Sequence, residues 1–476
     1  MIATVRPGRL ALVLMAVVAG VARDAAAQPP DLDPRIVKLV QTVSDERLGV
    51  ILKKLESFGT RHLLSSTDKP DKGIGAAREW ILAEMKSYSP RLQVAFDVHV
   101  LPKGGRVTRE VEARNVMAVL PGKSPRRIYV SGHYDTTARV GGQGAANAGG
   151  PTFRDPDAPT PPPADPNAPV DNPAPGVNDD GSGTALTMEL ARVFGQSGID
   201  FDATLVFMCH VAEEEGLLGA RAHAQKAVAE KIRIDAVLNN DIVGGSVGGN
   251  GIVDGATIRV YSEGPEDSPS RELARFVQRW GERYVPSHKV RLMSRPDRFG
   301  RGGDHSAYSP LGFAAVGFRE SRENFTRQHD PRDTFDGISL PYLAQNARVN
   351  AASAAALALA PAAPTVNNQR GQPQISRRTS GYDANLTWTP SEGAVAYRIF
   401  WREAWGPDWQ HDLLVGGDAC AARPNAPANS LPCGLVLPNM QIDDFVFGVA
   451  AVDAQGHESL VTPYVAPPRA ATPARQ

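Results

Sequence analysis

Three consecutive glutamates, Glu213, Glu214 and Glu215, follow a hydrophobic segment and are the most informative feature of the chain. Five further residues of metal-ligand type lie elsewhere in the sequence: His133, Asp135, Asp179, Asp241 and His329. Zinc takes imidazole nitrogen and carboxylate oxygen, and two ions ~3.5–4 Å apart can share a bridging carboxylate and a bridging water. The set therefore predicts a paired-metal hydrolase.

Each of these residues lies just past an apolar run or at a glycine-rich turn. Segments 128–130, 204–209 and 236–238 are short and continuously apolar, which is typical of fully buried strands. The carboxyl ends of parallel strands meet at one edge of an open α/β sheet, where ligands bind. Residues that are distant in the sequence are therefore expected in one crevice.

The elements around these strands alternate between helical and strand patterns. Helices are expected at 184–196, 217–230, 269–284 and 340–358, and strands at 204–209, 236–239, 257–262 and 313–318. Upstream we expect helices beginning at Asp33-Pro34 and at Ser44, a helix at 73–88, and a hairpin of 92–101 with 107–120. This rhythm predicts an α/β fold with a mainly parallel mixed sheet and helices on both faces.

A chain of 476 residues is too long for one ordinary core, so two or three units are expected. Residues 1–27 have the pattern of a cleavable signal peptide, with two arginines, an apolar stretch at 10–21 and alanines before Gln28. We predict a catalytic unit at 28–361, in which the Pro/Gly-rich segment 139–175 is an insertion. That insertion either shapes the cleft or is a disordered surface excursion, and the second reading is favoured for most of it.

Residues 362–476 have a different character. Ala384, Leu386 and Trp388 alternate with polar residues, as do two later segments, and short alternating strands predict a small β-sandwich. This region resembles a fibronectin type III module, which would offer a surface for a cell-surface or protein ligand. Cys420 and Cys433 could pair in an oxidising compartment, whereas Cys209 is expected to be a buried thiol.

Charge and hydropathy exclude some classes of partner. The formal net charge is −1, and no basic stripe suggests a nucleic-acid partner. The apolar stretch at 10–21 is shorter than the ~20 residues that span a bilayer. We therefore expect a secreted or periplasmic protein without a membrane span.

Residues 75–358 resemble the di-zinc exopeptidases related to bacterial leucyl aminopeptidase and glutamate carboxypeptidase. The segments that carry the resemblance, in family order, are Gly132-His133-Tyr134-Asp135, Gly176-Val177-Asn178-Asp179-Asp180-Gly181-Ser182-Gly183, Ala212-Glu213-Glu214-Glu215-Gly216-Leu217, Asn240-Asp241 and His329-Asp330-Pro331-Arg332-Asp333-Thr334. Each motif alone is weak, but the ordered set is specific.

The resemblance implies a role for each matched residue. Asp179 bridges two zinc ions, His133 and Asp241 complete one site, and Glu214 and His329 complete the other. Glu213 is then the base that activates the water between the metals.

The resemblance also suggests residues around the ligands. Asp135 is expected to accept the second ring N–H of His133, and Asp333 could do the same for His329. Five residues are possible substrate contacts: Asp304, His305, Tyr308, Arg298 and Arg301. Asp304 could equally be a helix cap, and the two arginines could form a fork for a substrate carboxylate or be ordinary surface residues.

The expected function is that of a secreted zinc-dependent exopeptidase, most simply an aminopeptidase acting on peptides. A carboxypeptidase of the same family is the nearest alternative, and a one-zinc glutaminyl cyclase-like transferase is a more distant one. A non-catalytic protein that binds a partner through the β-sandwich is the rival from another class. A single aspartate or histidine commonly lies only in a turn or at the surface, and a run of glutamates commonly begins a helix. The ordered set of five motifs nevertheless favours catalysis.

Overall fold

The computed structural model describes residues 32–138, 169–421 and 431–465. The predicted signal peptide, and residues 139–168 of the predicted insertion, lie outside the described residues. Among the described residues, no helix is long and apolar enough to cross a bilayer.

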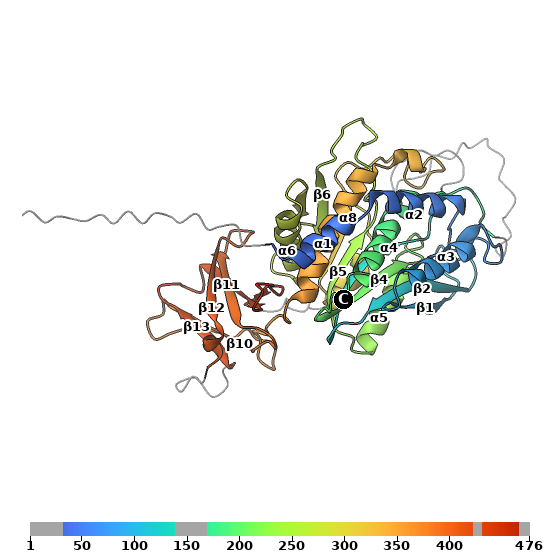
Figure 1. Cartoon of the computed structure of the whole chain (residues 1–476). Helices are drawn as coiled ribbons and strands as arrows, with labels where there is room; N and C mark the ends of the chain where they lie inside the picture. Colours follow the sequence, from blue (N-terminus) through green and yellow to red (C-terminus); the bar gives the residue numbers. More distant parts are fainter. Residues whose placement is uncertain (1–31, 139–168, 422–430, 466–476) are drawn as a thin grey trace, which may run out of the picture. The chain divides into compact units, whose positions relative to one another are not determined.

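An eight-stranded mixed sheet forms the centre of the larger part of the chain (Figure 1). Its strands, in spatial order, are β1 (Gln93–Leu101), β2 (Val111–Leu120), β4 (Ala203–His210), β3 (Ser124–His133), β5 (Ile234–Asn240), β8 (Ala315–Glu320), β6 (Thr257–Ser262) and β7 (Lys289–Met293). β4, β3, β5 and β8 run parallel to one another, whereas β1 with β2, β2 with β4, and β6 with β8 are antiparallel. The predicted α/β class with a mixed sheet is confirmed.

Helices cover both faces of this sheet because successive side chains of a strand point to opposite faces. Ile128 and Val130 pack on the face covered by α1 (Pro34–Thr42), α2 (Asp45–Ser57), α3 (Gly73–Tyr88), α4 (Gly181–Gly195), α6 (Pro269–Tyr284) and α8 (Leu340–Leu359). Tyr129 packs on the other face against α5 (Leu218–Ala229) and α7 (His305–Tyr308). Short 3-10 helices occur at Ser309–Leu311, Phe335–Gly337 and Gly417–Cys420.

Two smaller antiparallel sheets follow α8. One contains β13 (Cys433–Leu437), β10 (Ala384–Trp388) and β9 (Ile375–Arg377). The other contains β12 (His411–Gly416), β11 (Ala396–Glu403), β14 (Phe445–Val452) and β15 (Thr462–Pro463). They share a core of their own that includes Trp388, Ile399 and Phe447, so the predicted β-sandwich is present.

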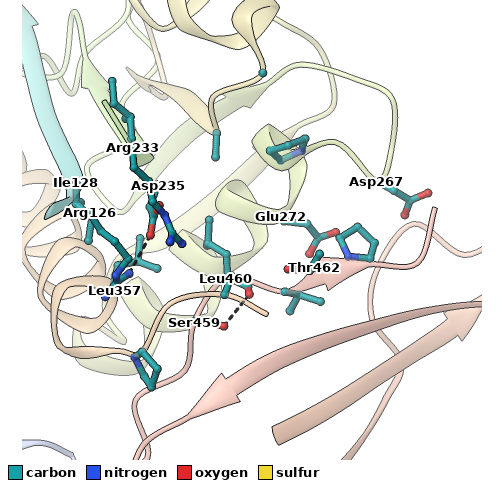
Figure 2. Close-up of a pocket in the computed structure, with 18 residues that line it drawn as sticks. Arg126, Ile128, Arg233, Asp235, Asp267, Glu272, Leu357, Ser459, Leu460 and Thr462 are labelled. Carbon is teal, nitrogen blue, oxygen red and sulfur yellow. Dashed lines mark hydrogen bonds and ion pairs between the residues drawn. The ribbon is translucent and has the colours of Figure 1, made fainter. Parts of the chain in front are cut away.

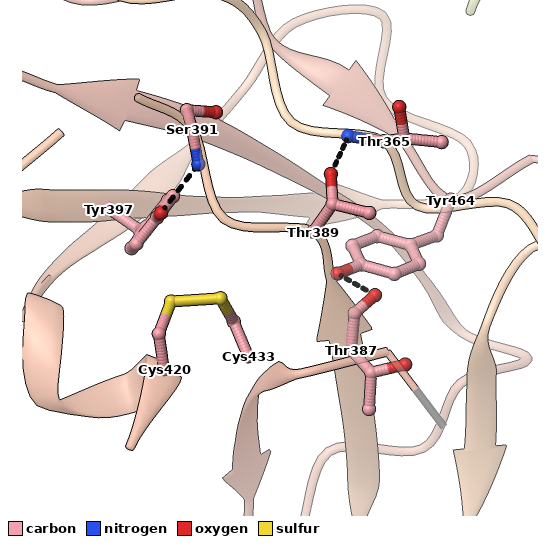
Figure 3. The surroundings of a disulfide bond; sticks show 8 residues. All are labelled: Thr365, Thr387, Thr389, Ser391, Tyr397, Cys420, Cys433 and Tyr464. Carbon is pink, nitrogen blue, oxygen red and sulfur yellow. Dashed lines mark hydrogen bonds between the residues drawn. A yellow bond between two sulfur atoms is a disulfide. The ribbon is translucent and has the colours of Figure 1, made fainter. Parts of the chain in front are cut away.

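A disulfide joins Cys420 to Cys433 in this C-terminal region (Figure 3). The same figure shows Tyr464, whose hydroxyl donates to the carbonyl of Thr387. The remaining cysteine, Cys209, is a buried free thiol, as expected.

Removing this disulfide should destabilise the C-terminal sheets without affecting chemistry at the large sheet. The bond spans a sequence separation of 13 residues, and cross-linking a loop of this size contributes about 2–3 kcal/mol. We expect the Cys420→Ala/Cys433→Ala variant to melt at a lower temperature in calorimetry, with the transition of the large sheet unchanged. Wild-type protein treated with reductant is the control, and an unchanged melting curve would contradict a stabilising role.

Candidate metal centre

The five residues predicted as metal ligands come together at the carboxyl ends of the parallel strands. His133 is the last residue of β3, Asp241 follows β5, and Asp179 lies in the turn before α4. Glu214 is in the turn after β4, and His329 is in the loop after β8. Their convergence follows from the parallel strand order, because these strands end at the same edge.

Asp179 lies between the two histidines and directs one carboxylate oxygen toward each of them. His133 Nε2 is 3.5 Å from Asp179 Oδ1, and His329 Nε2 is 3.1 Å from Asp179 Oδ2. His133 Nε2 also lies 3.8 Å from Asp241 Oδ1, and His329 Nε2 lies 3.2 Å from Glu214 Oε2. The side chains thus form two three-residue groups that share Asp179.

The side chains of these two groups are better suited to binding cations than to hydrogen bonding with one another. Four buried atoms, one each from His133, Asp179, Glu214 and Asp241, lack a hydrogen-bond partner within the described chain. Buried polar atoms are normally satisfied, and their donor types are those that zinc prefers. The residues present therefore fit bound zinc.

The electrostatics of the site lead to the same conclusion. Burial and the neighbouring carboxylates of Asp241 and Glu214 raise the pKa of Glu213 well above its usual value. Burial alone would lower the pKa of His133, but Glu213 and the other nearby carboxylates raise it well above its usual value. Clustered carboxylates in a low-dielectric site need positive charge nearby, which bound cations would supply.

Glu213 is close to this centre without belonging to either three-residue group. Its Oε2 lies 4.0 Å from His133 Nε2, and its side chain is 13% exposed. It is therefore placed beside the proposed ligands, with its carboxylate available for proton transfer.

Asp180, next to the shared carboxylate, joins three segments of the site. Its carboxylate accepts hydrogen bonds from the backbone N–H groups of His133, Gly183 and Ile242. Asp180 therefore caps α4 and also ties this helix to the ends of β3 and β5. The Asp179-Asp180 peptide bond is cis.

Asp135 supports the site differently from the sequence-based expectation. The nearest acceptor for His133 Nδ1 is the backbone carbonyl of Asp135 at 3.1 Å, whereas the carboxylate lies 3.6 Å away. The carboxylate instead accepts the backbone N–H groups of Glu213 and Glu214, at 3.3 and 3.2 Å. Asp135 therefore holds the turn that carries the two glutamates.

Asp333 has a similar structural role on the other side of the centre. Its carboxylate accepts the backbone N–H groups of Asn178 and Asp179, at distances of 2.9–3.2 Å. Among the contacts of the described residues, none joins its carboxylate to the ring of His329, which the sequence analysis suggested as its partner. Asp333 thus positions the shared carboxylate rather than the histidine.

Arg319 is a buried residue of this site that sequence reasoning missed. Its guanidinium pairs with the Oδ2 oxygen of Asp241 and with Asp297, and it also donates to the carbonyls of Asp241 and Gly302. The contact with Oδ2 leaves Oδ1 of Asp241 facing His133. Its position in the sequence could have indicated this role, because Arg319 follows the predicted strand 313–318 directly.

The two arginines considered for a substrate carboxylate are engaged within the protein. Arg298 pairs with Asp297 and Glu323, and its side chain is 9% exposed. Arg301 donates to Gln328 and lies 3.6 Å from Glu323. Their positive charges are therefore largely balanced by internal carboxylates.

The segment 304–308 contributes three buried side chains with different surroundings. Asp304 is fully buried, neither of its carboxylate oxygens has a hydrogen-bond partner in the described structure, and burial and the charge of Glu213 raise its pKa. The ring of His305 is hydrogen-bonded through Nε2 to the carbonyl of Pro296. Tyr308 has no accessible surface and its hydroxyl lies 3.3 Å from His210 Nε2, so it packs behind the strands rather than facing a substrate.

Arg61 is a second buried arginine that the sequence did not reveal. It donates to the carbonyls of Tyr134, Pro175 and Gly176 at 2.6–2.8 Å, and to that of Leu55 at 3.2 Å. Thr136 strengthens this clamp, because its hydroxyl donates to the carbonyl of Ala174, 38 residues away. The stretches that lead from His133 and into Asp179 are therefore fastened to one side chain.

A cavity of about 250 Å³ lies elsewhere, at the opposite edge of the large sheet. Figure 2 shows Arg126 and Ile128, near the start of β3, beside Asp235 and the segment containing Leu460. Arg126 is paired with Asp202 and Asp235. The cavity contains none of the residues of the candidate centre.

This chain is similar to a known peptidase family and to several zinc metalloproteases. A model described as Peptidase family M28 matches residues 115–354. A probable zinc metalloprotease of Pyricularia oryzae is 35% identical over 92% of this chain and 85% of its own length. Another, of Leptosphaeria maculans, is 31% identical over 90% of this chain and 96% of its own length.

Solved structures show the same fold. The LapA aminopeptidase of Legionella pneumophila matches with a TM-score of 0.50 and 19% identity, over 68% of this chain and 74% of that protein. At this level of identity the likeness concerns the fold alone. It agrees with the α/β architecture around the candidate centre.

Proposed function

Since the chain belongs to peptidase family M28 and is a zinc metalloprotease of that family, we propose that it is an exopeptidase that removes residues from the N-terminus of peptides. The observation that carries this proposal is the position of Asp179 between His133 and His329, with one oxygen directed at each ring.

We propose that the centre holds two zinc ions. Asp179 would be shared, His133 and Asp241 would complete one site, and Glu214 and His329 the other. Two zinc ions bound in this way would polarise the scissile carbonyl as Lewis acids and lower the pKa of water.

Glu213 is the proposed general base. Its carboxylate lies beside the ligand groups and belongs to neither, and its backbone N–H is held by the carboxylate of Asp135. It would accept a proton from the attacking water and deliver it to the leaving amine. Arg319 would keep Asp241 in place by binding the oxygen that faces away from His133.

The charge distribution favours a substrate amino group over a substrate carboxylate. Glu213 and Asp304 have carboxyl groups beside the centre, and bound cations or a substrate ammonium group would favour their charged forms, while Arg298 is neutralised by Asp297 and Glu323. A protonated N-terminus is attracted by an excess of carboxylates, and a C-terminal carboxylate is repelled. This supports the aminopeptidase assignment over the carboxypeptidase alternative.

End-blocked peptides test this assignment. We expect a peptide with a free N-terminus to be cleaved, its N-acetylated form to resist cleavage, and its C-terminally amidated form to be cleaved like the parent, as read by mass spectrometry. Loss of cleavage on amidation, with acetylation tolerated, would instead indicate a carboxypeptidase. Zinc-loaded protein that cleaves none of the three peptides would favour the alternative of a non-catalytic protein that binds a partner through its β-sandwich.

We further propose export and a role for the C-terminal sheets in binding a surface or protein ligand. The pattern of residues 1–27 and the disulfide in the C-terminal region support an oxidising compartment. The alternation of residues in β10, β11 and β14 supports a fibronectin type III-like module. N-terminal sequencing of exported protein should begin at Gln28, and recovery of the uncleaved chain inside the cell would argue against export.

A further inference from the structure

A second cluster of metal-ligand side chains lies on the other side of the large sheet from most of its helices. Asp97 and His99 are two residues apart on β1, and His223 is on α5. His99 Nε2 lies 2.7 Å from Asp97 Oδ2, and His223 Nδ1 lies 2.8 Å from the same oxygen. Two imidazoles therefore meet at one carboxylate oxygen.

Three nitrogen atoms crowd around this oxygen. Asn115 Nδ2 is also 3.1 Å from Asp97 Oδ2, which makes three nitrogen neighbours with His99 and His223. A carboxylate oxygen offers about two lone-pair sites. By contrast, Asp97 Oδ1 has Lys226 Nζ at 3.0 Å. A cation at Oδ2, with both histidines supplying lone pairs, would replace this crowded set of donors.

The spacing and burial of the cluster suit a coordinated ion. The three candidate donor atoms lie within 4.8 Å of one another. Ligands about 2.0–2.2 Å from one zinc ion are roughly 3–3.5 Å apart, so only small shifts are needed. Asp97 and His223 are buried, whereas His99 is 14% exposed and so provides a route to solvent.

The surroundings also provide the contacts that usually orient metal ligands. The second ring nitrogen of His223 is 3.1 Å from the hydroxyl of Tyr129. With Nε2 as the donor, this hydrogen bond corresponds to the tautomer that leaves Nδ1 free for a metal.

Lys226 is the group that would compete with an ion. Its ammonium balances the charge of Asp97, but its side chain is 46% exposed. It can therefore stay on Oδ1 or move into solvent when a divalent cation binds Oδ2.

We propose that Asp97, His99 and His223 form an additional zinc site, distinct from the peptidase centre and structural in role. Two imidazoles and a carboxylate are a donor set that zinc accepts, with water completing the coordination. None of the three residues belongs to the ligand groups of the peptidase centre.

The position of the cluster explains what such an ion would do. Asn115 Oδ1 accepts the backbone N–H of Val211, and Asn115 Nδ2 donates to the carbonyl of Gly219 as well as to Asp97. Val211 and Gly219 are the two ends of the turn that carries Glu213 and Glu214. An ion that joins β1 to α5 would therefore brace this turn from behind.

Zinc content measured on the whole protein tests the proposal. We expect His99→Gln and His223→Gln to lose one equivalent of zinc after exhaustive buffer exchange and to retain the zinc of the peptidase centre. His411→Gln, on the smaller sheets, is the matched control and should lose none. Equal zinc content in wild type and His99→Gln, or the same loss in the control, would overturn the proposal.

Two further measurements do not depend on the folding of a histidine variant. Crystals of wild-type protein grown with zinc alone should give an anomalous difference peak at the zinc edge between Asp97, His99 and His223. In the Asp179→Asn background, one equivalent of zinc should remain and should disappear when His99→Gln is added. Absence of the anomalous peak would overturn the proposal, whatever happens at the peptidase centre.

Discussion

Replacing Glu213 with glutamine should lower turnover by about 10²–10⁴-fold, which is the usual contribution of a positioned general base. The amide has the same shape but cannot accept the proton of the attacking water. Because Glu213 belongs to neither ligand group, the zinc content should equal that of the wild type. Steady-state hydrolysis of a leucine chromogenic amide, together with metal analysis of the same sample, measures both effects.

The two neighbouring glutamates provide matched controls on the same turn. Glu214→Gln should lose zinc together with activity, because its carboxylate lies 3.2 Å from His329 Nε2. Glu215→Gln should keep both, since burial raises the pKa of Glu215 to about 9 and the neutral acid resembles the amide. Wild-type turnover in Glu213→Gln would remove this residue from the mechanism.

The largest effect on metal binding is expected for Asp179→Asn. Its two oxygens face different histidines, at 3.5 and 3.1 Å, so the change weakens both halves of the centre at once. Loss of an outer-shell partner typically costs 10–100-fold in metal affinity, and loss of a shared ligand should cost more than about 100-fold. Zinc retention in competition with a chelator, measured beside peptidase activity, tests this expectation.

Asp333→Asn provides the comparison for this variant. The carboxylate of Asp333 accepts hydrogen bonds from the backbone N–H groups of Asn178 and Asp179 and belongs to neither ligand group, so Asp333→Asn should weaken zinc retention less than Asp179→Asn does. A variant Asp179→Asn that keeps all its zinc would show that the carboxylate is not shared between two ions.

Much of the frame could be predicted because local patterns and the fold agree. The helix at 269–284 coincides with α6, where Ser268 accepts a capping bond from Arg271 and Pro269 begins the helix. The strand at 257–262 coincides with β6, and the helix at 73–88 with α3. The edge strand β7 was missed because it has only five residues with little continuous apolar character.

The members of the candidate centre could be identified from residue type and position after strands, but their supporting contacts could not. Asp135 and Asp333 each have several possible partners, and only the folded backbone places turn N–H groups closer than an imidazole. The role of Arg319 depends on β8 lying next to β5, which is a property of the sheet order. The cluster of Asp97 and His223 joins residues 126 positions apart, for which the sequence offers no local pattern.

The hydrogen bonds of Arg61 make the chain between Thr136 and Ala174 a suitable site for inserting or replacing residues. The described residues on either side, Thr136 and Ala174–Gly176, are hydrogen-bonded to Arg61 or to each other. A change in the chain between them therefore need not move His133 or Asp179. Residues 139–168 are therefore the place to introduce a short spacer or a fluorescent reporter, and retained peptidase activity in such a variant would show that the Arg61 clamp isolates the catalytic geometry.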